Sequence, residues 1–246
     1  MRIIEVSDYK QMSVKAAQHV IGKIMKSDCL TLGLATGGTP TGLYGELIED
    51  HHVNGTSYKC VNSINLDEYI GLSKEDPNSY FQYMCSNLFS HIDIALENTH
   101  IPSGMATDLQ KECDRYEKLI EETGGIDLQI LGIGENGHIG FNEPGTSFQS
   151  GTHLVELTES TREANARYFS SIDEVPRQAI TMGISTIMKS REILLLVSGK
   201  SKQDAMKKLL ENEVTESFPA SILRNHPNVT IIADKDALTM VQHLHR

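Results

Sequence analysis

The sequence predicts an α/β protein: a Rossmann-like, mostly parallel sheet with helices on both faces, in a single domain over residues 1–246. Three observations predict this class. Short apolar runs, typical of buried strands, alternate with stretches of helical periodicity. Strands that alternate with helices pair in parallel and are covered on both faces. No repeat, low-complexity tract or linker rich in Pro, Gly and Ser divides the chain.

The N-terminal half begins with a strand and continues in alternation. Strands are predicted at residues 2–6, 29–35, 58–66 and 99–101, each a short apolar run. Amphipathic patterns predict helices at about residues 8–25, after residue 40, and at 78–89 and 108–122. In the second of these helices, Thr39 is suited to the N-cap and Pro40 to the first position.

The C-terminal half continues the same pattern. Its strands are predicted at residues 127–133, 154–157, 192–197 and 228–233, and residues 179–188 are mixed. Its helices are predicted at residues 161–169 and 201–210, with a last helix at the C-terminus.

Composition limits the function. A formal net charge of −11 disfavours binding to nucleic acid or to an anionic membrane. No apolar run approaches the roughly 20 residues of a membrane span, and no signal-peptide pattern opens the chain. The 4 cysteines are scattered without a CxxC pair, as in proteins with reduced thiols. We therefore expect a cytoplasmic protein that binds a small molecule.

Polar, glycine-rich segments follow four strands, and parallel strands bring such segments to one edge. They read TGGTPTG (36–42), DEY (67–69), GENGHIGFNEP (134–144) and SGKSK (198–202). TGGTPTG is a strand-to-helix turn, whose backbone N–H groups and helix N-terminus suit an anion. Lys202 is one cation that could complete this site, and Arg167 is another, with Arg162 as its competitor. The chain has no P-loop, and the helix required after a GxGxxG fingerprint is missing.

The segment from residue 127 to 144 organises the chain, because it passes from a buried strand into a loop dense in functional groups. In this loop, His138 has an unperturbed pKa near neutrality, and Glu143 is close enough in sequence to orient it. Asp67 and Glu68 follow another strand. Since side chains alternate, we expect only one of them to face the cleft, where it could take a proton next to a carbonyl or imine. No metal-ligand spacing is visible.

Together these segments resemble the glucosamine-6-phosphate deaminase (glucosamine-6-phosphate isomerase) family. The matching stretches, which span nearly the whole chain, are LGLATGGTPTGLY (32–44), NLDEYIGL (65–72), SYFQYM (79–84), LGIGENGHIGFNEPG (131–145), TREANARYF (161–169) and VPRQAITMGISTIM (175–188). The resemblance implies conversion of glucosamine 6-phosphate and water to fructose 6-phosphate and ammonia, without metal or organic cofactor. It places the protein in amino-sugar catabolism and N-acetylglucosamine degradation, and we class the reaction as that of a hydrolase.

The resemblance also implies roles for single residues. Asp67 would take and return the proton at C2 and C1. His138 would open the sugar ring, with Glu143 as its orienting partner and Asn136, where some members have Asp, as a supporting residue. The phosphate clamp would consist of Gly37, Gly38, Thr39, Arg167 and Lys202.

Two alternatives stay open from the sequence. A 6-phosphogluconolactonase would share the phosphate pocket and a similar histidine loop, although the DEY and TREANARYF segments favour the deaminase. A non-catalytic sugar-phosphate sensor would be expected to carry a helix-turn-helix and to lack the catalytic acid, whereas Asp67, His138 and Glu143 are all present.

Regulation is the last expectation. Larger family members are hexamers, activated by N-acetylglucosamine 6-phosphate through basic residues beyond the NEP segment and a tyrosine on a C-terminal extension. Here residues 152–155 contain no Arg or Lys, and the chain stops at Arg246. We expect a monomer or small homo-oligomer without that activation. Residues 145–153 and the following helix are the candidates for a moving lid.

Overall fold

The computed structural model describes residues 1–241, and its centre is a sheet of seven parallel strands. The strands are β1 (Arg2–Val6), β2 (Leu30–Leu34), β3 (Val61–Asn65), β5 (Thr99–His100), β6 (Leu128–Leu131), β9 (Ile193–Val197) and β10 (Val229–Asp234). Their order is β1-β10-β9-β6-β2-β3-β5, and each neighbouring pair is parallel. The predicted Rossmann-like α/β architecture is therefore confirmed.

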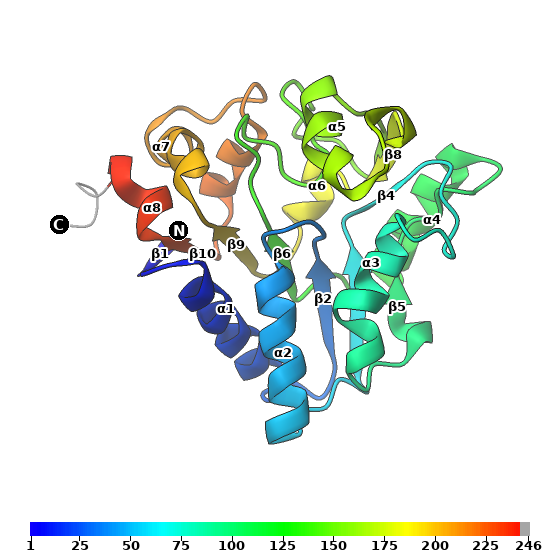
Figure 1. Cartoon of the computed structure of the whole chain (residues 1–246), viewed down its shortest axis with the longest axis horizontal. Helices are drawn as coiled ribbons and strands as arrows, with labels where there is room; N and C mark the ends of the chain where they lie inside the picture. Colours follow the sequence, from blue (N-terminus) through cyan, green and yellow to red (C-terminus); the bar gives the residue numbers. More distant parts are fainter. Residues whose placement is uncertain (242–246) are drawn as a thin grey trace.

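Helices cover both faces of this sheet, as Figure 1 shows. One face carries α1 (Tyr9–Ile24), α2 (Thr41–Asn54) and α3 (Tyr80–Asn87). The other carries α4 (Leu109–Glu122), α6 (Ile184–Ile187), α7 (Gln203–Glu211), the 3₁₀ helix Pro219–Asn225 and α8 (Lys235–Leu238). Shorter 3₁₀ helices lie at Phe89–His91, Leu96–Asn98, Ala166–Tyr168, Ile172–Glu174 and Lys200–Lys202. Because both faces are covered, the strands are apolar on both sides.

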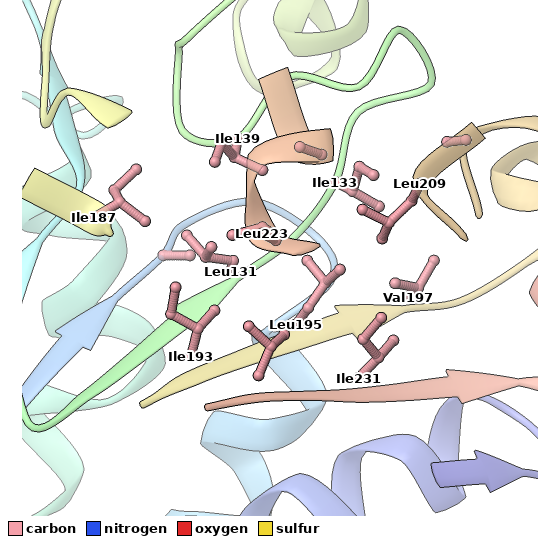
Figure 2. Packing of buried hydrophobic residues seen from close by; sticks show 14 of the residues in the cluster. Leu131, Ile133, Ile139, Ile187, Ile193, Leu195, Val197, Leu209, Leu223 and Ile231 are labelled. Carbon is pink, nitrogen blue, oxygen red and sulfur yellow. The ribbon is translucent and has the colours of Figure 1, made fainter. Parts of the chain in front are cut away.

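Strand β9 shows how one strand contributes to both layers of the core. Figure 2 shows Ile193, Leu195 and Val197 in the cluster beneath α7. Leu194 and Leu196 point the other way and pack with α1 and α2. All five are at most 1% exposed. Side chains alternate across a strand, so an uninterrupted apolar run is what a doubly covered strand requires.

A second sheet holds the three antiparallel strands β4 (Asp67–Tyr69), β8 (Gln178–Thr181) and β7 (His153–Glu156), in the order β4-β8-β7. In Figure 1, β4 and β8 lie at the upper right, together with α5 (Glu159–Asn165). A single residue, Leu66, separates β3 of the large sheet from β4 of the small one. Residues 67–69 were predicted as a polar segment that follows the third strand, and in the structure they form a strand of their own, which pairs with β8.

The start of α2 also differs from the prediction. Its N-cap is Pro40 rather than Thr39, its first helical residue is Thr41, and no side chain caps it. In the absence of a side-chain cap, the N–H of Gly42 in the first turn of α2 bonds to the hydroxyl group of Tyr9.

The two strands at the middle of the large sheet define where a ligand can bind. The chain leaves β2 toward β3 on one side, whereas it leaves β6 toward β9 on the other. The neighbouring strands β2 and β6 therefore form a topological switch point. In open α/β sheets, ligands bind in the crevice at the carboxyl ends of such strands.

Candidate active site

A cavity of about 450 Å³ lies at this switch point. Its walls come from the segments after β2, β6 and β9, and from the start of β4. Seven of the predicted site residues line it: Gly37, Gly38, Thr39, Asp67, Asn136, His138 and Lys202. Residues that the sequence analysis did not single out also line it, among them Tyr80, Phe141, Thr161 and Asn165. The aromatic Tyr80 and Phe141 are stacked, with ring centroids 6.1 Å apart.

We call residues 36–40 the anion turn. Gly37 has a φ of +90°, which favours glycine because it has no Cβ. The backbone N–H groups of Gly37, Gly38 and Thr39 have no acceptor among residues 1–241. Three N–H groups left without partners beside the start of a helix form a concavity suited to a phosphate or another anion.

Two cations lie near this turn, and a third lies elsewhere. Lys202 lines the cavity, and partial burial lowers the pKa of its ammonium group, an effect that the nearby Glu135 opposes. The Arg167 guanidinium lies over Gly38, with Nη2 3.6 Å from the position of a Cβ there. Arg162 is buried and donates hydrogen bonds to the carbonyls of Ile172 and Val175. Of the two arginines considered from the sequence, Arg167 is therefore the one at the site.

Asp67 and Glu68 point to opposite sides of β4, as the alternation predicted. Asp67 lines the cavity and is 6% exposed, and no donor among residues 1–241 forms a hydrogen bond to it. Burial, together with the charge of Glu68, raises the pKa of its carboxyl to about 8. Glu68 accepts hydrogen bonds from the backbone N–H groups of Tyr69 (2.9 Å), Tyr80 (3.0 Å) and Phe81 (3.1 Å). Glu68 thus stabilises the N-terminus of α3, whereas Asp67 presents a buried carboxyl group to the cavity.

His138 contacts Glu143 through Asn136. The Nδ1 atom of His138 lies 2.8 Å from Asn136 Oδ1, and Asn136 Nδ2 donates to Glu143 Oε2 at 2.7 Å. The direct distance from Nδ1 to Glu143 Oε2 is 3.7 Å, too long for a hydrogen bond. The sequence predicted Glu143 as the orienting partner of His138, and in the structure the contact between them passes through the amide of Asn136.

This chain of contacts fixes the tautomer of the histidine. A carboxylate only accepts, so the amide of Asn136 directs its Nδ2 group toward Glu143 and its Oδ1 atom toward His138. An amide oxygen also only accepts, so Nδ1 carries the proton and Nε2 is the acceptor. Burial lowers the pKa of His138 and so favours the neutral ring, whereas the charge of Glu143 opposes this effect.

Glu143 is itself fixed from the other side of the cavity. Its Oε1 atom accepts from Thr161 Oγ1 at 2.5 Å and from Thr158 Oγ1 at 3.4 Å. Both threonines lie at the start of α5, where Thr158 is the N-cap. The carboxylate thus joins the histidine loop to the segment that carries Arg167.

The loop at residues 145–153 is tied to the body of the protein. The N–H groups of Gly145 and Phe148 donate to Glu216, at 2.8 Å each. Thr152 donates to Glu117 of α4 through its N–H (2.7 Å) and its hydroxyl (2.6 Å). These hydrogen bonds hold residues 145–153 in place, as in a fixed loop, although the segment was one of the two candidates for a moving lid.

Three comparisons with known proteins bear on this geometry. The family described as "Glucosamine-6-phosphate isomerases/6-phosphogluconolactonase" matches residues 7–232. A glucosamine-6-phosphate deaminase of Halalkalibacterium halodurans is 61% identical over 241 residues, which are 98% of this chain and 98% of that protein. The chain belongs to this family. The resemblance stated from the sequence is thereby confirmed.

Solved structures support this family assignment at two levels. One described as a monomeric glucosamine-6-phosphate deaminase is 52% identical, has a TM-score of 0.96, and matches over 98% of this chain and 100% of its own. A 6-phosphogluconolactonase from Trypanosoma cruzi has a TM-score of 0.80 at 20% identity, over 98% of this chain and 97% of its own. The second likeness shows a shared fold alone. The names of the closely similar family members describe a deamination, so the label of hydrolase is not supported.

Residues 1–241 lack both a cluster of metal ligands and a helix that could span a membrane. They contain no group of three or more His, Cys, Asp or Glu side chains that could hold a metal ion. None of the helices they form is long and apolar enough to cross a membrane.

Proposed function

We propose that this protein converts glucosamine 6-phosphate and water into fructose 6-phosphate and ammonia. The observation that carries the proposal is that Asp67 and His138 face one cavity that is also lined by the anion turn and Lys202, with Arg167 beside Gly38. Isomerisation of a sugar phosphate needs a group that binds the phosphate, a proton shuttle near the sugar ring and a base near the reacting carbons. The resemblance to deaminases over 98% of the chain supports the same reaction.

The first step is ring opening. His138 Nε2 takes the proton of the C1 hydroxyl, the bond between C1 and the ring oxygen breaks, and the proton passes to that oxygen. Because Asn136 accepts from Nδ1, the ring presents an unprotonated Nε2. The imidazolium that forms transiently lies 3.7 Å from the carboxylate of Glu143, which stabilises it.

The second step is proton transfer between C2 and C1. Asp67 removes the proton from C2 while O1 gains a proton, which gives an enolamine. Asp67 then returns its proton to C1 while the nitrogen loses one, which leaves an imine at C2 and a hydroxyl group at C1. Water adds to this imine, and ammonia leaves the resulting carbinolamine. A buried carboxylate whose pKa is raised to about 8 is a suitable base, because general bases work best when their pKa lies near the operating pH.

The phosphate is proposed to bind to the anion turn, with Lys202 and Arg167 as its cations. We infer further that residues 1–246 form one domain of this kind and that the protein acts as a monomer. A solved relative described as monomeric supports the oligomeric state. The cytoplasmic location and the place in amino-sugar catabolism stay predictions.

A coupled ammonia assay on the purified protein tests the proposal. Glucosamine 6-phosphate should release ammonia and form fructose 6-phosphate in equal amounts. Unphosphorylated glucosamine should be a very poor substrate, and 6-phosphogluconolactone should be hydrolysed no faster than in buffer. Lactone hydrolysis without ammonia release would favour the lactonase instead, and binding of sugar phosphate without either reaction would favour a sensor.

A further inference from the structure

Three carbonyl groups of the anion turn, and that of Ala35 before it, accept hydrogen bonds from tyrosine hydroxyl groups on three helices. Tyr44 of α2 donates to the carbonyl of Ala35 at 2.5 Å. Tyr83 of α3 donates to the carbonyl of Gly37 at 2.6 Å. Tyr9, the first residue of α1, donates to the carbonyls of Gly38 (3.0 Å) and Thr39 (3.2 Å). Tyr9 and Tyr83 bond to the glycine-rich part of the turn, although neither lines the cavity.

The hydroxyl group of Tyr9 spans the turn and the helix that follows it. Besides donating to the turn, it accepts the backbone N–H of Gly42 at 2.8 Å, in the first turn of α2. The helices are packed closely here: a Cβ at Gly42 would lie 2.2 Å from Ser13 Oγ and 3.0 Å from the ring of Tyr9. One hydroxyl group therefore joins α1, the anion turn and the first turn of α2.

Tyr83 makes a similar connection from the other side. Thr41 Oγ1 donates to the same Gly37 carbonyl at 3.1 Å and lies 3.1 Å from the Tyr83 hydroxyl. Gly37 is the residue of the turn with a positive φ, and its carbonyl is thus bonded to two hydroxyl groups. Glycine has the greatest backbone freedom of all residues, so these two hydrogen bonds restrict the backbone rotation of Gly37.

Peptide geometry connects these bonds to the ligand. In a trans peptide, the C=O of one residue and the N–H of the next point in opposite directions. Tyr83 fixes the peptide between Gly37 and Gly38, and Tyr9 fixes the peptide between Gly38 and Thr39. The N–H groups of Gly38 and Thr39 are the opposite ends of these peptides, and they have no partner among residues 1–241.

We propose that Tyr9 and Tyr83 are positioning residues for phosphate binding: by bonding to the carbonyls of the anion turn from outside the cavity, they direct the N–H groups of Gly38 and Thr39 toward the substrate phosphate. The inference deepens the proposed function and rests on it. Preorganised donors bind an anion more tightly than donors that must first be ordered.

The variants Tyr9→Phe and Tyr83→Phe test this, with Tyr58→Phe as the matched control. Tyr58 is a buried tyrosine whose hydroxyl also donates to a backbone carbonyl, that of Leu47 in α2, but it does not bond to the turn. Calorimetric titration with inorganic phosphate measures the anion site without turnover. Each test variant should bind phosphate about three to ten times more weakly, the usual effect of losing one hydrogen bond. KM for glucosamine 6-phosphate should rise to match, with a much smaller fall in kcat.

The control separates positioning from general loss of structure. Tyr58→Phe should bind phosphate as the wild type does, even if its melting temperature falls as far as those of the test variants. Phosphate affinities unchanged in both test variants would overturn the inference, and so would an equal loss in Tyr58→Phe. A wild type that binds phosphate but releases no ammonia would overturn the proposed function only, because the titration still decides on the tyrosines. A wild type that binds no phosphate would overturn both.

Discussion

At the scale of single residues, Asp67 is buried, and its carboxyl group accepts no hydrogen bond from residues 1–241. The ionised form that the proposed reaction needs is therefore the form that destabilises the folded protein. The pKa of Asp67 is raised from 3.8 to about 8 in the folded protein, so its contribution to stability is present at low pH and is lost as pH rises toward 8. Asp67→Asn should lower kcat by roughly two orders of magnitude or more and raise the melting temperature at pH 8, with little change in fructose 6-phosphate binding. Steady-state kinetics and calorimetry measure these effects. Near-wild-type turnover would make Glu68 the next candidate for the base.

The same pKa predicts the pH dependence of the reaction. Only the ionised form of Asp67 can take the C2 proton, so kcat/KM should rise from pH 6 and level off above about pH 8. Glu68 raises the pKa of Asp67 by its charge, so Glu68→Gln should move the rise to lower pH. A full pH profile of both proteins measures the shift. An unchanged midpoint in Glu68→Gln would contradict this coupling.

Asn136 predicts a third effect, on the histidine. Replacing its amide by a carboxylate places a negative charge 2.8 Å from Nδ1. Asn136→Asp should therefore raise the pKa of His138 and reduce the fraction of neutral ring at pH 7. NMR titration of the His138 ring protons measures this, with the other histidine signals as an internal control. A pKa that stays the same or falls would show that the new carboxyl is protonated and shares a proton with Glu143.

At the scale of elements, α5 and the 3₁₀ helix after it carry two arginines with separate roles. Arg167→Ala and Lys202→Ala should each weaken fructose 6-phosphate binding by about 1.5–3 kcal/mol, the value of a charge-assisted hydrogen bond. Arg162→Ala should instead lower the free energy of unfolding, because the carbonyls of Ile172 and Val175 lose a buried donor. Calorimetric titration and denaturant unfolding measure the two effects. Equal losses of affinity in both arginine variants would contradict the separation.

The elements of the large sheet were predictable from the sequence, whereas the small sheet was only partly so. Strands such as β9 are short, apolar and bounded by turns, and local pattern is enough to identify them. Strand β4 has three residues, two of them acidic, and it exists because β8, more than 100 residues later, pairs with it. Pairing between distant segments overrides local propensity, and a single sequence does not show it.

The site was predictable as a set of side chains but not as a set of contacts. Motifs placed Asp67, His138 and the anion turn at one sheet edge, and the structure confirms this. The position of Asn136 between histidine and glutamate depends on side-chain rotamers, which spacing does not determine. The hydroxyl groups of Tyr9 and Tyr83 reach the turn from helices 29 and 46 residues away, so only the tertiary structure reveals them.

At the scale of the whole molecule, residues 152–155, where the resemblance implies an effector site in larger family members, are unsuited to a phosphate here. Thr152, in the stretch that lacks Arg and Lys, donates to the carboxylate of Glu117, whose charge would repel an anion. We expect hyperbolic velocity curves, no activation by N-acetylglucosamine 6-phosphate, and a monomer. Light scattering and kinetics with and without the effector measure this. Sigmoidal curves that become hyperbolic with the effector would contradict it.

The division of the site between two sheets has a consequence for protein engineering. The anion turn, His138 and Lys202 belong to segments that leave the large sheet, whereas Asp67 belongs to the small one, one residue beyond β3. Under the proposed function, the segments that bind the phosphate and the strand that carries the base would therefore belong to separate sheets. A library that varies β4 and β8 while leaving the large sheet intact would search for new chemistry on phosphorylated sugars. Its members would be expected to keep the affinity for the phosphate group that all such substrates share.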